Sequence, residues 1–81
     1  MRLIVNIDVP DLARGIDFYT AALGLTSSRT LDGDVAELTG ASSTIYLLAN
    51  PPGSAPVATL PITRDYHRHW TPVHLDFVVD N

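Results

Sequence analysis

The stretch VPDLARGIDFYTAALGL, residues 9–25, contains a helix start, an apolar stripe and a helix stop. Pro10 ends a preceding strand, and the Asp11 carboxylate can accept hydrogen bonds from the free N–H groups of a helix that begins after it. The apolar side chains then recur at helical spacing, as Leu12, Ile16, Tyr19 and Leu23. Gly24 supplies a left-handed cap. These signals predict an amphipathic helix over residues 12–23.

The segment before the helix, residues 2–9, alternates with the period of a strand. One face carries Leu3, Val5, Ile7 and Val9, and the other carries Arg2, Asn6 and Asp8, with Ile4 as its apolar exception. Because the helix also has one apolar side, we expect it to pack on the first of these faces. Ile16 is then a core residue.

The segment after the helix changes to short strands, at residues 26–31, 35–38 and 43–49. Turn signals separate them at Asp32-Gly33-Asp34 and at Gly40-Ala41. The pattern predicts an antiparallel meander, on which we expect Glu37 to be a plain exposed residue.

Composition limits the functions that these elements can serve. The 81 residues are 46% hydrophobic and carry a net charge of −4, with no Lys and no basic run, so neither a nucleic-acid footprint nor a polybasic membrane patch is present. The absence of Cys excludes disulfides, thiolate metal ligands and Cys nucleophiles. The opening MRLIVNIDVP is too short for a signal sequence, and no apolar stretch is long enough for a membrane span. We therefore expect a cytoplasmic protein with a small-molecule partner.

The rest of the chain is a connector followed by another alternating segment. Five Pro and Gly residues fall between positions 50 and 61, so residues 50–72 are predicted to be a linker and loop. Residues 73–79 alternate again and predict a fifth strand. LIVNIDVPD near the start and PVHLDFVVDN at the end share one strand pattern, with Asn81 in the place of Asp11. We expect a single module over residues 1–81, in which 73–81 begins an incomplete second module and stops where a second helix should start.

The order of strand, acidic cap, helix with the aromatic pair Phe18-Tyr19, and Leu23-Gly24 resembles the opening of the vicinal-oxygen-chelate superfamily, which contains glyoxalases, bleomycin-resistance proteins and extradiol dioxygenases. HWTPVHLDFVVDN, residues 69–81, looks like the second-module opening of glyoxalase-like members. The resemblance implies an α+β fold, a βαβββ module with a mixed sheet that forms half of a paired-module cup. It is more specific for fold than for function, since the superfamily includes lyases, isomerases, dioxygenases, epimerases and drug-sequestering proteins.

The resemblance also implies positions for metal ligands. Superfamily enzymes hold a divalent metal with a His or Gln on the first strand of each module and a Glu on its last strand. The first-strand position lies seven residues before the capping residue, which gives Ile4 in the first module and His74 in the second. The Glu position falls near Tyr46 or Leu47, neither of which is a carboxylate. We therefore expect no cofactor, with Fe, Mn, Ni or Zn bound through His74 as the alternative.

Candidate ligand-binding residues follow from the face opposite the helix and from the loop at 64–70. They are Asn6, Asp8, Tyr46 and Asp76 on the sheet, with His67 and Trp70 on a rim that could cover an apolar or planar ligand. A carboxylate on this face could act as a general base if burial raised its pKa; alternatively the acids are ordinary surface residues. The spacing of His67 and His69 is compatible with a metal pair, and equally with a solvated rim.

Three functions remain open from the sequence. The first is small-molecule binding or sequestration of the bleomycin-resistance type, which the missing donors favour. The second is a metal-dependent lyase, isomerase or dioxygenase that uses His74. The third is a non-catalytic truncated module. For each of them we expect a homodimer, because a single module leaves the apolar side of the last strand uncovered.

Overall fold

One helix and four strands follow each other in the predicted order in the computed structural model, which describes residues 1–80. The elements are β1 (Ile4–Val9), α1 (Leu12–Leu23), β2 (Thr26–Leu31), β3 (Val35–Thr39) and β4 (Thr44–Ala49). Asn81, predicted to take a capping position, lies outside the described residues. In the part that is described, no helix is both long and apolar enough to cross a membrane.

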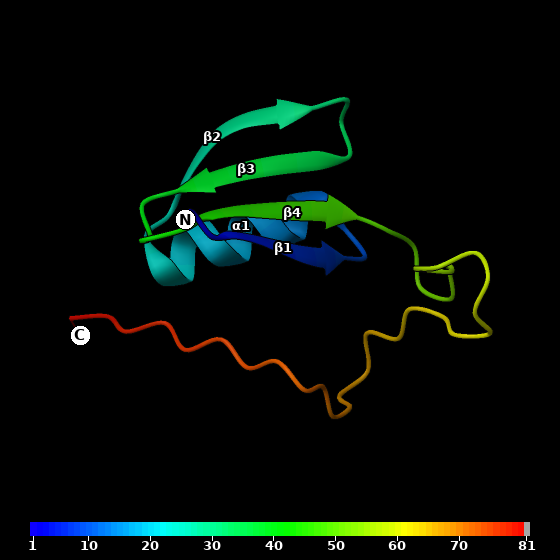
Figure 1. Cartoon of the computed structure of the whole chain (residues 1–81). Helices are drawn as coiled ribbons and strands as arrows, with labels where there is room; N and C mark the ends of the chain where they lie inside the picture. Colours follow the sequence, from blue (N-terminus) through cyan, green and yellow to red (C-terminus); the bar gives the residue numbers. More distant parts are fainter. Residues whose placement is uncertain (81) are drawn as a thin grey trace.

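The strands form one mixed sheet in the order β1-β4-β3-β2 (Figure 1). β2, β3 and β4 are antiparallel neighbours, which confirms the predicted meander, and β1 pairs with β4 in parallel. The parallel pair is possible because α1, β2 and β3 lie between its two strands in the sequence. The fold is the predicted α+β, βαβββ module.

Local signals fix both ends of α1. The Asp11 side chain accepts a hydrogen bond from the Arg14 backbone N–H at 3.1 Å, which satisfies one of the free donors of the first turn. Gly24 adopts a left-handed conformation with φ of 68°, and its N–H donates to the Thr20 carbonyl at 3.1 Å. These caps account for the agreement between the predicted and observed bounds of the helix.

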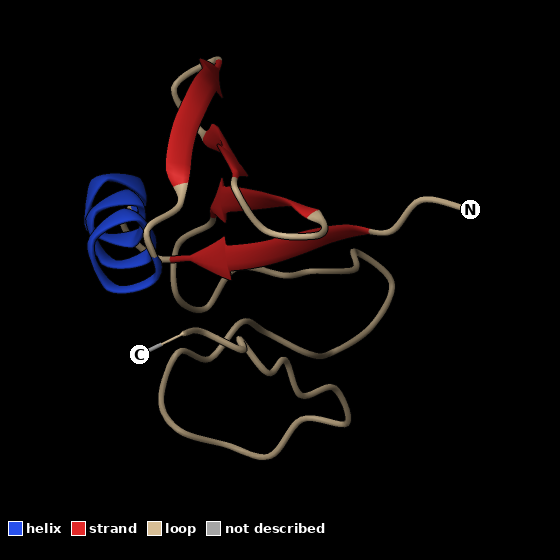
Figure 2. Ribbon diagram, turned by 90° about the vertical axis from the view of Figure 1, so that its left-hand side faces the viewer, coloured by secondary structure: helices blue, strands red, loops and turns tan. Residues whose placement is uncertain are grey.

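The core lies between α1 and one face of the sheet (Figure 2). Its buried side chains come from the sheet and the loop before β2; they are Val9, Leu25, Ala36, Leu38, Ile45 and Leu47. The apolar stripe of α1 packs against them, as predicted. At Gly15 an added Cβ would lie 3.2 Å from Val9 and 3.3 Å from Leu47, so glycine allows the helix to approach closely. Leu3 was expected in this core but is 65% exposed, because it precedes the strand.

The predicted fifth strand, residues 73–79, is not formed. Beyond residue 72 the chain runs extended beneath α1 and β1 (Figure 1), but none of its described residues makes a strand hydrogen bond to the sheet. Leu75 and Phe77 line a groove with Leu3, Val5 and Ile45, and the Phe77 ring lies 6.4 Å from that of Tyr19. An extended segment without a paired backbone is not a strand, so the alternation alone overpredicted it.

Candidate functional site

The sheet face opposite α1, called here the open face, carries a row of polar side chains across its middle. Asn6 on β1 stands beside Tyr46 on β4, which pairs with Glu37 on β3, which in turn pairs with Arg29 on β2. Residues in register on neighbouring strands project to the same side of a sheet. The burial of β3 and β4 alternates, so Ala36, Leu38, Ile45 and Leu47 face the core, whereas Glu37 and Tyr46 lie on the open face.

A β-bulge directs two side chains of β2 to one residue of β3. Ser27 pairs with Leu38 and Arg29 with Glu37, which leaves Ser28 as the extra residue. The Ser28 hydroxyl donates to Glu37 Oε1 at 2.8 Å, and Arg29 Nη2 donates to Oε2 at 3.2 Å. From the other side, the Tyr46 hydroxyl donates to Oε2 at 2.6 Å. The Glu37 carboxylate is thus held by donors from both neighbouring strands.

These donors keep Glu37 anionic. The hydrogen bond from Tyr46 is the main cause that lowers the pKa of Glu37, and the bond from Ser28 adds to it. The Glu37 side chain is only 16% exposed, whereas that of Arg29 is 58% exposed. The prediction that Glu37 is a plain exposed residue was therefore wrong: strand register and the bulge enclose it among partners.

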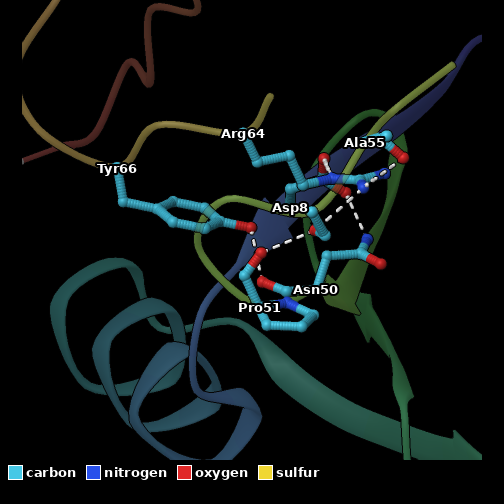
Figure 3. A network of polar contacts seen from close by, with 7 residues as sticks. Asp8, Asn50, Pro51, Ala55, Arg64 and Tyr66 are labelled. Carbon is cyan, nitrogen blue, oxygen red and sulfur yellow. Dashed lines mark hydrogen bonds and ion pairs between the residues drawn. The ribbon is translucent and has the colours of Figure 1, made fainter. Parts of the chain in front are cut away.

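A second polar cluster lies at the carboxyl ends of β1 and β4 (Figure 3). Asp8 accepts a hydrogen bond from Asn50 Nδ2 at 2.9 Å through one carboxylate oxygen and pairs with Arg64 Nε at 2.8 Å through the other. The Tyr66 hydroxyl donates to the Asn50 carbonyl at 2.9 Å, and burial is the first cause that raises the pKa of Tyr66. Asp8 lies on the predicted face, but its carboxylate binds the connector.

The remaining predicted ligand residues do not gather on the open face. Asp76 lines grooves at the other side of the sheet, together with Leu75 and Phe77. Trp70 is 78% exposed, and the His67 side chain is 98% exposed. His67 Nδ1 lies 2.9 Å from Asp65, and the His67 backbone N–H is the main cause that lowers the pKa of the Asp65 carboxyl. Of the predicted ligand residues, Asn6 and Tyr46 thus lie side by side on the open face, and Asp8 lies at the end of the same face.

The donor set does not fit the metal site that the resemblance implied. Ile4 has no donor atom, and the hydroxyl of Tyr46 is directed to Glu37. His74 is exposed, and among residues 1–80 no three His, Cys, Asp or Glu side chains come together in a group that could hold a metal ion. No chemical step can be assigned to a metal at this face.

The sequence did not indicate that Glu37, Arg29 and Arg64 belong to polar clusters. For Glu37 a signal existed, since alternation along β3 puts it on the same side as the neighbouring Tyr46. The bulge that brings Ser28 and Arg29 to it has no clear signature in the stretch TSSRTL. The pairing of Arg64 with Asp8 joins residues 56 positions apart and follows from the path of the connector.

A family model described as the glyoxalase-like domain matches residues 4–81. The crystal structure of lactoylglutathione lyase from Agrobacterium tumefaciens is similar, with a TM-score of 0.55 and 22% sequence identity, over 79% of this chain and 48% of that one. The chain thus spans about half the length of the lyase, and at this identity the likeness is one of fold. No curated protein matches the sequence.

Proposed function

Because this chain belongs to the glyoxalase-like domain family of the vicinal-oxygen-chelate superfamily, we propose that it binds a small molecule on its open face. In this proposal it binds the ligand in the manner of a bleomycin-resistance protein and lacks the family's full metal site. Binding or sequestration needs a shaped surface and placed polar groups, but no reacting metal. The two missing first-module donors, at Ile4 and at Tyr46, support binding over metal-dependent catalysis.

The observation that carries this proposal is the fixed polar row in the middle of a face that no helix covers (Figure 2). Glu37 is held by three side chains, so its carboxylate and the Tyr46 hydroxyl are preorganised before a ligand arrives. Ile4, Val35 and Leu48 lie on the same face beside the row. This arrangement suits a ligand with an apolar or planar body and a few hydrogen-bonding atoms.

A single sheet face is half of a cup, and the proposal therefore includes a second module. β1 is an edge strand, and no described residue pairs with its outer side. Two copies joined along this edge would bring two open faces toward one ligand. His67 and Trp70, both exposed, are proposed to form the rim of that cup.

Nuclear magnetic resonance titration tests the proposal, with S-lactoylglutathione and metal-free bleomycin as probes. We expect at least one of them to shift the backbone amides of Asn6, Glu37 and Tyr46. Glu37→Gln should weaken this binding, whereas Asp17→Asn, on the exposed side of α1, serves as the control. Shifts confined to α1 would contradict the proposal.

Metal analysis of the purified protein distinguishes small-molecule sequestration from the alternative, a metal-dependent enzyme. A stoichiometric transition metal that is lost on His74→Ala would favour a metal-dependent lyase, isomerase or dioxygenase. Ligand binding in protein that contains no metal would favour sequestration.

A further inference from the structure

The connector between β4 and the extended segment contains a closed loop, residues 53–64, called here the connector loop. Two backbone hydrogen bonds close its base: the Gly53 N–H donates to the Arg64 carbonyl at 2.9 Å, and the Arg64 N–H donates to the Ser54 carbonyl at 2.8 Å. A surface loop whose ends lie this close is an Ω-loop in form. Within the predicted linker and loop, residues 50–72, these bonds give the connector loop a defined base.

Side-chain bonds tie this base to the sheet. The Arg64 guanidinium donates through Nε to Asp8 on β1, and through Nη1 to the Ser54 hydroxyl at 3.1 Å and the Ala55 carbonyl at 3.1 Å. One side chain thus joins both ends of the loop to the strand (Figure 3). Arg64 is only 18% exposed and Asp8 34% exposed, so this ion pair is less screened by water and salt than a fully exposed pair.

We propose that Asp8 and Arg64 form a latch that holds the connector loop closed against the carboxyl ends of β1 and β4, and that the loop opens by breaking this ion pair while the sheet stays folded. The sheet is stabilised by its own ladders and by the core beneath α1, neither of which involves the loop. The loop's side chains are largely exposed, including Val57, Leu60 and Ile62. Because the loop buries so little area of its own, its closed conformation depends on the contacts at its base.

Cleavage of the peptide bond after Arg64 reports whether the latch is open or closed. Trypsin must take an arginine side chain into its own pocket, so it can cleave after Arg64 only when that side chain has left Asp8. Arg68 is exposed, and cleavage after it does not require the latch to open. The ratio of cleavage after Arg64 to cleavage after Arg68 therefore measures the opening within a single chain.

The experiment compares this ratio in the wild type with the ratio in Asp8→Asn and in the control Asp17→Asn. We expect Asp8→Asn to raise it roughly tenfold or more, which corresponds to about 1.4 kcal/mol, and Asp17→Asn to leave it unchanged. Amide exchange of Leu38 and Leu47, both fully buried, reports whether the sheet has stayed folded. An unchanged ratio in a folded Asp8→Asn protein would overturn the latch.

A second variant covers the case in which Asp8→Asn does not fold. Arg64→Lys keeps the charge and the trypsin site but cannot make the three bonds that the guanidinium makes to Asp8, Ser54 and Ala55. Cleavage after residue 64 should again rise relative to cleavage after Arg68, and no rise would refute the latch. Neither variant needs a ligand, so this result is independent of the proposed function.

Discussion

The carboxylate of Glu37 accepts hydrogen bonds from Ser28, Arg29 and Tyr46, which come from two different strands. In the folded chain these bonds lower the pKa of Glu37 below its ordinary value, and the bond from Tyr46 contributes most. A group whose pKa is lowered by folding stabilises the fold above its unfolded pKa, and this contribution is lost as the pH falls through the lowered folded pKa. The cluster is therefore a source of acid sensitivity.

We predict that Tyr46→Phe raises the pKa of Glu37 toward its ordinary value, because it removes the 2.6 Å bond that lowers the pKa most. The measurement is a carbon-13 titration of the Glu37 carboxyl. Tyr66→Phe is the matched control, since the Tyr66 hydroxyl donates to Asn50. The difference in Tm between Tyr46→Phe and the wild type should also shrink in acid, where Glu37 is protonated in both proteins. An unchanged titration curve would show that Tyr46 does not hold the carboxylate.

The helix α1 illustrates what can be predicted from sequence at the scale of an element. Its bounds depend on Asp11 and Gly24, which act within one turn, so they could be predicted without knowledge of the rest of the chain. The strand predicted at residues 73–79 could not be decided in this way, because a strand requires a partner that local alternation does not supply. The same limit explains why the partners of Glu37 and Arg64 could not be predicted. The partners of Glu37 depend on strand register, and that of Arg64 depends on the path of the connector.

The burial of Leu47 and Ile16 predicts which of two alanine substitutions destabilises the fold more. Leu47 is fully buried under α1, so Leu47→Ala should lower the free energy of unfolding by roughly 2–5 kcal/mol. Ile16 packs on the same core from the helix but is only half-buried, and Ile16→Ala should cost less. Urea unfolding monitored by circular dichroism would measure both changes. Equal losses would mean that α1 is seated more deeply than this packing indicates.

At the scale of the whole molecule, apolar side chains beside the unpaired edge of β1 support assembly with a second copy. Phe77 is 38% exposed and contacts Tyr19, whereas Val78 is 96% exposed. If two copies exchange residues 73–79, Phe77 would occupy the same groove in the partner. The long connector between β4 and this segment would permit that exchange.

We predict that light scattering at micromolar concentration gives twice the chain mass of 8.8 kDa. Phe77→Ser should shift the equilibrium toward the monomer, because it removes a side chain that lines the groove with Leu3 and Val5. Val78→Ser is the control, since its parent side chain is almost fully exposed. A wild-type monomer at this concentration would contradict both the dimer and the shared cup.

The parallel pairing of β1 with β4 has a consequence for how the chain acquires its structure. Ile4 pairs with Thr44, so this ladder closes a loop of about 40 residues, whereas β2, β3 and β4 join through short turns. Closing long loops is entropically costly and slows folding. The meander is thus expected to form early in the transition state and β1 to dock late, so that substitutions in β1 mainly accelerate unfolding while those in β3 slow folding.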